Sequence, residues 1–197
     1  MMRVIAGEAK GRTLVVPRGG ATRAATDRIR ETLFAILEPE LPDANVLDLF
    51  AGAGSLGIEA LSRGARSATF VERDAEALKA LRRNLETTRF ADRAHVVPAG
   101  VTAFLGARPV GPFDIAFVDP PFVDVAGAEA TLGHDALGPA LAAEGLVVVR
   151  SLRKHAPRLP ASMRVVRAKN IGEETLFFLR YGPALAEGRG GATGDDE

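Results

Sequence analysis

The stretch that decides the fold, residues 45–57, reads NVLDLFAGAGSLG. Its apolar start is typical of a buried strand, and the continuation IEALSRG predicts a helix that stops at Gly64. Gly52, Gly54 and Gly57 match the pattern G-x-G-x-x-G, in the strand-to-helix context that gives this pattern meaning. Glycines let a ligand approach the backbone closely, and the helix N-terminus offers free N–H groups. The stretch therefore predicts a strand–turn–helix unit that binds a cofactor.

Short apolar runs and helical patterns keep alternating beyond this turn. Such alternation with short connections predicts a parallel α/β sheet with helices on both faces. The last two apolar runs are adjacent, which predicts a hairpin at one sheet edge. We expect strands at 67–72, 95–100, 113–122, 145–151, 164–169 and 174–181, a helix over 127–142, and a helix that is capped by Asp74 and carries Leu78, Leu81 and Leu85 on one face.

The first 40 residues carry a different pattern. Two β-type runs at 3–6 and 12–16 flank GEAKG and predict a hairpin. A basic loop follows, and apolar residues then recur at helical spacing from Asp27 until Pro39 ends the helix. The tail AEGRGGATGDDE is polar and rich in glycine, which is typical of disorder.

Two acids near the glycine turn bear on the identity of the cofactor. Glu72 ends the next predicted strand, where a carboxylate can accept hydrogen bonds from ribose hydroxyls. Asp48 precedes Gly52 by four residues and would repel the pyrophosphate of a dinucleotide. It would attract a cofactor that carries an ammonium group. The pair favours S-adenosylmethionine over NAD, the alternative being a plain tight turn with surface acids.

The tetrapeptide Asp119-Pro120-Pro121-Phe122 follows the strand predicted at 113–122 and predicts the chemistry. The two prolines end the strand and stiffen the turn. The Asp119 carboxylate and the Pro120 carbonyl can then accept both hydrogens of one –NH₂ group. An aromatic amine is a poor nucleophile, so positioning it in line with an activated methyl group can supply much of the rate. Phe122 can stack on a base that has left its helix.

Composition excludes several classes of protein. Cysteine is absent and the three histidines are scattered, so we expect no metal site. No apolar run is long enough to span a membrane, and the N-terminus lacks a signal-peptide core, so we expect a cytoplasmic protein without membrane contact. The net charge is zero, but residues 1–30 hold seven basic and two acidic groups. This local excess predicts a phosphate-binding surface, and we expect RNA to approach from this side only.

The sequence resembles the RsmD-type 16S ribosomal RNA guanine-N2 methyltransferases over about residues 2–181. The resemblance rests on RVIAGEAKGRTL, ATDRIRETLFAIL, VLDLFAGAGSLGIEALSRGA, FVERD and FVDPPF, which occur in the family's order. It implies a Rossmann-like class I methyltransferase fold, with a seven-stranded, mostly parallel sheet and an N-terminal β-hairpin extension. It also implies methyl transfer from S-adenosylmethionine to the N2 amine of a guanine in 16S rRNA. We expect the partner to be 16S rRNA, either naked or within an assembling small ribosomal subunit, and the protein to be a monomer.

We expect three parts in the chain: an RNA-facing N-terminal hairpin and helix extension (1–40), an S-adenosylmethionine-binding catalytic domain (41–183) and a disordered tail (184–197). Amine binding falls to Asp119, Pro120, Pro121 and Phe122. Cofactor contacts fall to Asp48, Phe50, Ala51, Gly52, Gly54, Glu72, Arg73, Gly100 and Val101. RNA contacts fall to Arg3, Lys10, Arg12, Arg23, Thr26, Arg28 and Arg30, of which Thr26, Arg28 and Arg30 could instead meet the methionine end of the cofactor.

Two positions depart from the family pattern. Gly100-Val101 replaces an Asp or Asn followed by Ala, so the adenine would depend on the Val101 N–H and on apolar packing. Arg150 stands where an acidic residue is usual. Other readings remain open: an adenine-N6 or other amino-methyltransferase acting on RNA or DNA, a nicotinamide oxidoreductase, and a non-catalytic RNA-binding module. The oxidoreductase would leave the Asp-Pro-Pro-Phe turn unexplained, and the module would be expected to have lost Asp119 or the glycines.

Overall fold

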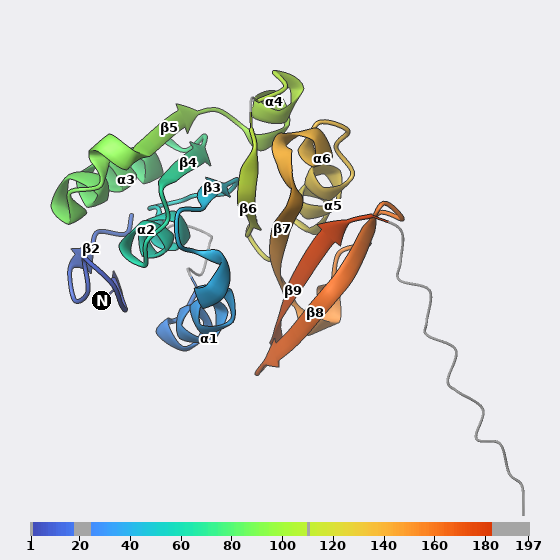
Figure 1. The fold of residues 1–197 in the computed structure, drawn as a ribbon, viewed down its shortest axis with the longest axis horizontal. Coiled ribbons are helices and arrows are strands. Elements are labelled where there is room, and N and C mark those ends of the chain that lie inside the picture. The colour runs from blue at the N-terminus through green and yellow to red at the C-terminus, as the bar shows by residue number, and fades with distance from the viewer. Residues whose placement is uncertain (1, 18–24, 110, 183–197) are drawn as a thin grey trace, which may run out of the picture.

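A seven-stranded sheet forms the centre of the protein, in the order β5-β4-β3-β6-β7-β9-β8 (Figure 1). The computed structural model describes residues 2–17, 25–109 and 111–182. Strands β3 to β7 pair in parallel, and β9 pairs antiparallel with both β7 and β8. The strands are β3 (Asn45–Asp48), β4 (Ser67–Glu72), β5 (Ala94–Pro98), β6 (Phe113–Val118), β7 (Leu141–Leu152), β8 (Met163–Ile171) and β9 (Glu174–Tyr181). The predicted fold class is confirmed.

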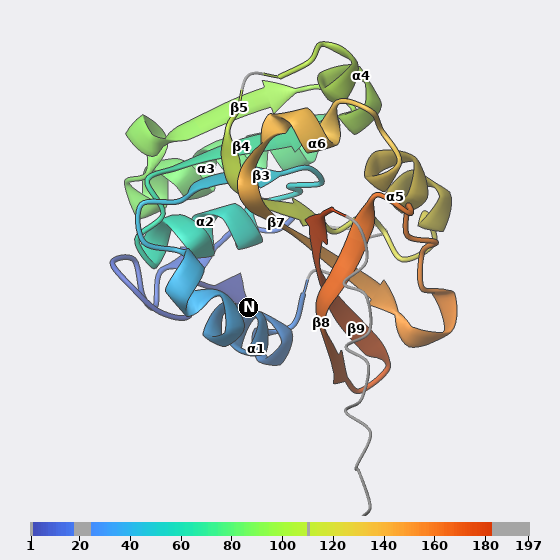
Figure 2. The ribbon, with the colours of Figure 1, turned by 45° about the vertical axis from the view of Figure 1, so that its right-hand side comes forward.

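Helices cover both faces of the sheet, as the views in Figures 1 and 2 show. Alternate residues of a strand point to opposite faces. Accordingly, Val46 and Phe70 pack with α1 (Asp27–Leu37), α2 (Ser55–Ser62) and α3 (Ala75–Thr88). Their neighbours Leu47 and Val71 pack with α4 (Val101–Gly106), α5 (Val125–Leu132) and α6 (Leu137–Ala140). Short 3₁₀ turns occupy Glu38–Glu40, Ala91–Arg93 and Arg153–His155.

The closing hairpin adds its second strand inside the sheet and its first strand at the edge. Leu176, Phe178 and Leu179 of β9 are buried, because helices or neighbouring strands cover them. Strand β8 instead exposes charged residues such as Arg167 and Lys169. Charged side chains on an edge strand discourage pairing with another chain. The pattern of the two strands therefore explains why β9, and not β8, lies next to β7.

The N-terminal extension packs against α2. Its strands, β1 (Met2–Arg3) and β2 (Thr13–Leu14), are shorter than the predicted runs, because a compact turn fills most of the sequence between them. The Ile5 N–H donates to Glu59 Oε2 at 2.8 Å and the Ala9 N–H to Ser62 Oγ at 2.9 Å. Val4 belongs to the same apolar cluster as the sheet. The extension thus shares the core of the sheet, while its role in facing RNA stays a prediction, and residues 184–197 lie outside the described part of the chain.

The prediction of one helix over 127–142 is wrong. Helix α5 ends at Leu132, before Gly133, and only the four residues of α6 follow before β7 begins at Leu141. Glycine is a poor helix former, which explains the break. Helix α4 was not predicted, since its six residues are too few to show a period. The predicted strand at 113–122 ends at Val118, ahead of the two prolines. In the described part of the chain, no helix has the length and apolar character needed to cross a membrane.

Candidate active site

Three carboxylates lie at one edge of the sheet, at the carboxyl ends of neighbouring parallel strands. Asp48 ends β3, Glu72 ends β4, and Asp119 directly follows β6. Strand β3 lies between the other two, and both Glu72 and Asp119 lie close enough to Asp48 for their charges to raise its pKa. In open α/β sheets this edge is where ligands bind. The structure therefore brings together the predicted cofactor acids and the predicted amine-binding acid.

Asp48 is a buried carboxyl with an unused acceptor. The residue is 1% exposed. Oδ2 accepts a hydrogen bond from the Gly57 N–H at 3.1 Å, whereas Oδ1 has no hydrogen-bond partner among the described residues. The pKa of Asp48 is raised to about 7, chiefly by burial; the negative charges of Asp119 and Glu72 also raise it, whereas the hydrogen bond from the Gly57 N–H lowers it. A cation beside Oδ1 would stabilise the ionised form of Asp48, so the site suits a ligand with an ammonium group.

Glu72 fixes the glycine turn to the end of β4. Oε2 accepts from the Gly52 N–H at 2.8 Å, and Oε1 accepts from the N–H groups of Arg73 and Asp74, both at 2.7 Å. The Arg73 side chain is exposed, so its contribution within the structure comes from the backbone. These three bonds hold the carboxylate in one orientation at the mouth of the crevice. Oε2, which accepts only one of these bonds, can still accept a further hydrogen bond from a ribose hydroxyl.

The glycine turn has the shape that a bound cofactor needs. Gly52 adopts a positive φ of 55°, and a Cβ placed there would have no atom within 4 Å, so open space lies in front of the backbone. Gly54 caps α2 with a φ of 86°. Both values fall in the left-handed region that glycine adopts without strain. Phe50 is half-buried and Ala51 donates its N–H to the Val71 carbonyl, which ties the start of the turn to β4.

Asn84, a residue that sequence reasoning did not find, joins the N-terminal extension to this turn. It is fully buried on α3. Its Nδ2 donates to the carbonyls of Val15 and Ala53, each at 2.9 Å, while Oδ1 accepts from the Val15 N–H at 2.7 Å. One side chain thus positions the extension beside the turn that carries the glycines predicted to bind the cofactor. No local pattern could have shown this, because the partners lie far apart in sequence.

Gly100 and Val101 lie at the same sheet edge as the acids, after β5. Gly100 caps α4 in an extended conformation, and a Cβ placed there would meet no atom within 4 Å. Val101 packs against the apolar cluster on the α4–α6 side of the sheet. The absence of a side chain at Gly100 leaves room near the cofactor crevice, in keeping with the expectation that backbone and apolar contacts hold the adenine.

Arg150, on β7, contacts two residues of the predicted amine-binding turn. Its Nε donates to Asp119 Oδ1 at 2.7 Å, and Nη1 lies 3.2 Å from Glu174 Oε2. Its guanidinium carbon also lies 4.6 Å from the centre of the Phe122 ring. Only 6% of the Arg150 side chain and 13% of the Asp119 side chain are exposed. One cation from β7 therefore holds two members of the Asp-Pro-Pro-Phe turn, which sequence reasoning had noticed only as an unusual residue.

The ionisation of Asp119 reflects a balance between burial and Arg150. Burial raises the pKa of Asp119, and the charge and hydrogen bond of Arg150 lower it, with burial the larger effect. Arg150 donates to Oδ1 of Asp119 at 2.7 Å, and a carboxylate has acceptor sites on both of its oxygens. Pro120 and Pro121 follow at once and cannot donate backbone hydrogen bonds. The turn therefore presents acceptors, as binding of an amine requires.

The predicted RNA-binding residues fall into two groups. Arg3, Lys10, Arg12 and Arg28 are exposed, as is Thr26, whose hydroxyl also caps α1. Arg30 has no exposed surface: it donates to the Arg3 carbonyl at 2.7 Å and pairs with Asp27 and with the buried Glu59. We therefore leave Arg30 out of the RNA surface and assign it to holding the extension in place. Arg23 lies outside the described residues.

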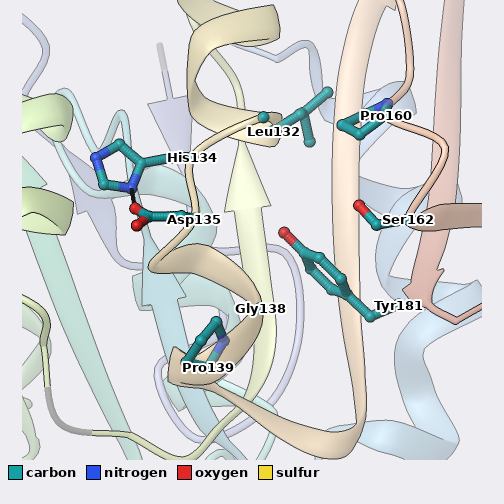
Figure 3. A pocket seen from close by; sticks show the side chains of 9 residues that line it. Leu132, His134, Asp135, Gly138, Pro139, Pro160, Ser162 and Tyr181 are labelled. Atoms are coloured by element: carbon teal, nitrogen blue, oxygen red, sulfur yellow. Dashed lines mark ion pairs between the residues drawn. The ribbon is translucent and has the colours of Figure 1, made fainter.

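A separate cavity of about 410 Å³ lies near α5, α6 and the end of β9 (Figure 3). Tyr181 borders it, and burial raises the pKa of this tyrosine to about 12. Strand β9 runs antiparallel to β7, so Tyr181 lies at the sheet edge opposite the three carboxylates. This cavity is therefore not part of the candidate active site. The described residues contain no group of His, Asp and Glu arranged to hold a metal ion.

Comparison with known proteins places the chain in a family. Residues 2–180 match the family described as Conserved hypothetical protein 95. The chain is also 41% identical to Ribosomal RNA small subunit methyltransferase D of Escherichia coli K12, over 87% of this chain and 86% of that protein. The chain belongs to this family. The predicted membership is thus confirmed, and with it the prediction of a methyltransferase.

Solved structures of similar proteins agree with this family. A putative methyltransferase from Escherichia coli is 40% identical and has a TM-score of 0.80, with 91% of this chain and 97% of that chain covered. A hypothetical protein from a Thermus species is 32% identical and has a TM-score of 0.75, with 90% and 98% covered. S-adenosylmethionine is the cofactor, as predicted, in keeping with membership of this methyltransferase family. The open space at Gly52 and the unused Oδ1 of Asp48 fit it.

Proposed function

We propose that this protein transfers a methyl group from S-adenosylmethionine to the N2 amine of a guanine in 16S ribosomal RNA. The observation that carries the proposal is Asp119, a buried acid beside the cofactor crevice that Arg150 holds at 2.7 Å. The relative in Escherichia coli is named for methylation of small-subunit ribosomal RNA, which supports this substrate. We further propose that the substrate is the RNA of an assembling small subunit, met in the cytoplasm by a monomer.

The cofactor crevice orients the reaction. S-adenosylmethionine, when bound, supplies a methyl group that its sulfonium has already activated. Asp48 would hold the ammonium end of the cofactor through its unpaired Oδ1. Glu72, fixed by three backbone N–H groups, would accept hydrogen bonds from the ribose. Gly52 would let the cofactor lie against the turn, because no side chain fills the space in front of it.

The Asp-Pro-Pro-Phe turn would hold the target amine. The second oxygen of Asp119 and the Pro120 carbonyl would accept its two hydrogens and turn its lone pair toward the methyl group. The N–C bond would form as the S–C bond of the sulfonium breaks, which leaves S-adenosylhomocysteine. The Asp119 carboxylate would stabilise the positive charge that develops on the nitrogen, and the amine would then lose one proton to this carboxylate or to water. Phe122 would stack on the extruded guanine, a contact worth about 1–3 kcal/mol. Arg150 would keep the acid and the ring in register, since it contacts both.

The same turn would read an adenine amine equally well, because it recognises only the presented –NH₂ group. The experiment must therefore identify the methylated base. Purified protein is incubated with 16S rRNA, or with small-subunit particles, and S-adenosylmethionine that carries a labelled methyl group. The RNA is then digested to nucleosides for mass spectrometry. The proposal expects label in N2-methylguanosine alone, whereas label in N6-methyladenosine would replace guanine by the alternative substrate.

A binding measurement tests the cofactor independently of RNA. S-adenosylhomocysteine at 100 times its Kd should stabilise the protein by about 2.7 kcal/mol, which thermal unfolding detects. NAD should leave the unfolding temperature unchanged, because the buried Asp48 beside the turn would repel its pyrophosphate. A shift with NAD and none with S-adenosylhomocysteine would contradict the assignment of the crevice.

A further inference from the structure

A second basic region lies beside the candidate active site, although the chain beyond residue 30 has a net negative charge. Residues 150–181 contain eight Lys and Arg against two Glu. Three of these cations, Arg153, Lys154 and Arg158, lie in the exposed stretch that leaves β7, and we call them the β7-exit cluster. The expectation that RNA approaches only from the N-terminal side rests on an average charge over the rest of the chain, and this average hides the second region.

The β7-exit cluster lies next to the turn that would hold the target amine. Strand β7 pairs in parallel with β6, so it ends at the same sheet edge as the Asp-Pro-Pro-Phe turn. A small cavity is lined by Pro121 and Phe122 from that turn and by His155 and Pro157 from the stretch that holds the cluster. The stretch that holds the cluster therefore borders the turn where an extruded base would enter.

The backbone around the cluster is fixed, so its position is a property of the fold. The Arg153 N–H donates to the Glu173 carbonyl in the β8–β9 turn at 2.8 Å. The Arg158 N–H donates to Glu129 Oε1 on α5 at 2.8 Å. These bonds anchor the stretch at both ends, between the closing hairpin and α5. The three cationic side chains therefore extend from a backbone that hydrogen bonds hold in place.

The charges of the β7-exit cluster are not neutralised within the described part of the protein. Arg153, Lys154 and Arg158 are all exposed, and none forms an ion pair there. Arg150, at the end of β7, does pair with acids. Cations that are close to one another without acidic partners attract a polyanion, and each phosphate they neutralise releases counterions.

We propose that the β7-exit cluster binds the phosphate backbone of the RNA next to the target nucleotide. This inference rests on the proposed function, since it takes RNA as the substrate. Phosphate contacts position a nucleic acid without reading its sequence. Contacts on the strand beside the extruded base hold that base in the Asp-Pro-Pro-Phe turn. The RNA then contacts two separate elements of the fold, namely the β7-exit cluster and the exposed cations of the N-terminal extension, Arg3, Lys10 and Arg12.

The test replaces Arg153, Lys154 and Arg158 together by Ala in the full chain. Binding of a 16S rRNA fragment is titrated at several salt concentrations, and methyl transfer is measured as a function of RNA concentration. The plot of log K against log salt should become shallower, by roughly 2 on single-stranded RNA at about 0.7 per lost phosphate contact. KM for RNA should rise at least tenfold while kcat at saturating RNA and the affinity for S-adenosylhomocysteine stay near those of the parent.

A matched control removes the same charge elsewhere. Arg66, Arg82 and Arg83 are exposed, form no ion pair within the described residues, and lie directly before β4 and on α3. Their triple Ala variant should bind RNA with the slope of the parent. If the two triple variants behave alike, the β7-exit cluster does not dock RNA. If the parent itself neither binds nor methylates RNA, the proposed function fails together with this surface, which separates the two outcomes.

Discussion

Replacing Arg150 by Met is the substitution with the most informative expected result. Met is apolar and similar in length, so it can fill much of the space while it removes three contacts at once. Those contacts are the hydrogen bond to Asp119 at 2.7 Å, the ion pair with Glu174 at 3.2 Å and the approach to the Phe122 ring at 4.6 Å. We expect loss of stability and a much larger relative loss of methyl transfer.

The magnitude follows from burial. Removing one partner of a buried ion pair costs about 3–5 kcal/mol, because the other charge stays buried without compensation. The Asp119 side chain is 13% exposed and can take up a proton, so we expect the lower end, about 3 kcal/mol. Loss of one preorganised polar group typically lowers kcat by about 10²–10³. The rate of methyl transfer by Arg150→Met should therefore fall by this factor even at temperatures where the variant is folded.

The pH dependence gives a signature that misfolding cannot mimic. Burial raises the pKa of Asp119 and Arg150 lowers it, so the pKa must rise further when Arg150 is gone. The proposed mechanism needs the carboxylate, so methyl transfer is lost as the pH falls through this pKa. In Arg150→Met the loss should begin at a higher pH than in the parent. Part of the missing rate should return as the pH is raised.

Single-turnover methyl transfer from about pH 6 to 9, with thermal unfolding at each pH, measures these effects. Arg150→Lys is the matched control, since it keeps the positive charge but cannot reproduce the planar guanidinium that contacts both Asp119 and Phe122. It should retain the pH profile of the parent and lose only part of the rate. A folded Arg150→Met variant with the rate and pH profile of the parent would refute the role given to Arg150.

Three further predictions concern the acids and the extension. Asp119→Ala should lower the rate of methyl transfer by about 10²–10³, while the affinity for S-adenosylhomocysteine, measured by calorimetry, stays within a few-fold. Loss of rate and affinity in parallel would refute the assignment of Asp119 to the amine. Because the pKa of Asp48 is raised to about 7, affinity for S-adenosylhomocysteine should be retained above that pH and weaken as the pH falls through it. Asp48→Asn should flatten this dependence, and an unchanged titration curve would exclude Asp48 as the ammonium partner. Replacing Arg3, Lys10 and Arg12 together by Ala should weaken RNA binding, with a salt slope about 2 to 3 smaller, and leave cofactor affinity unchanged; identical RNA titrations would place docking elsewhere.

The parts of the fold that the sequence predicts well are those encoded locally. The glycine turn was predicted because strand, glycines and helix follow one another within residues 45–64. The closing hairpin was predicted from two adjacent apolar runs. The helix over 127–142 failed because composition alone did not reveal that Gly133 ends α5. Short elements such as α4 show no full period and escape pattern recognition.

The active site shows the same division. Asp119 and Phe122 belong to one tetrapeptide, so their partnership is visible in the sequence. Arg150 lies 31 residues from Asp119, and their hydrogen bond exists only because β6 and β7 are neighbours. Arg30 looked like a surface cation in a basic segment, but its side chain is buried against Asp27 and the α2 helix. Contacts between distant segments decide such cases, and a single sequence does not contain them in readable form.

The central claim is that this protein methylates the N2 amine of a guanine in 16S rRNA through Asp119. Mass spectrometry of 16S rRNA from a strain that lacks the gene tests it most directly. One N2-methylguanine should be missing from this RNA, and it should return when the parent gene is supplied but not when the Asp119→Ala variant is supplied. An RNA whose N2-methylguanines are all present without the gene, or restored by the Asp119→Ala variant, would contradict the account.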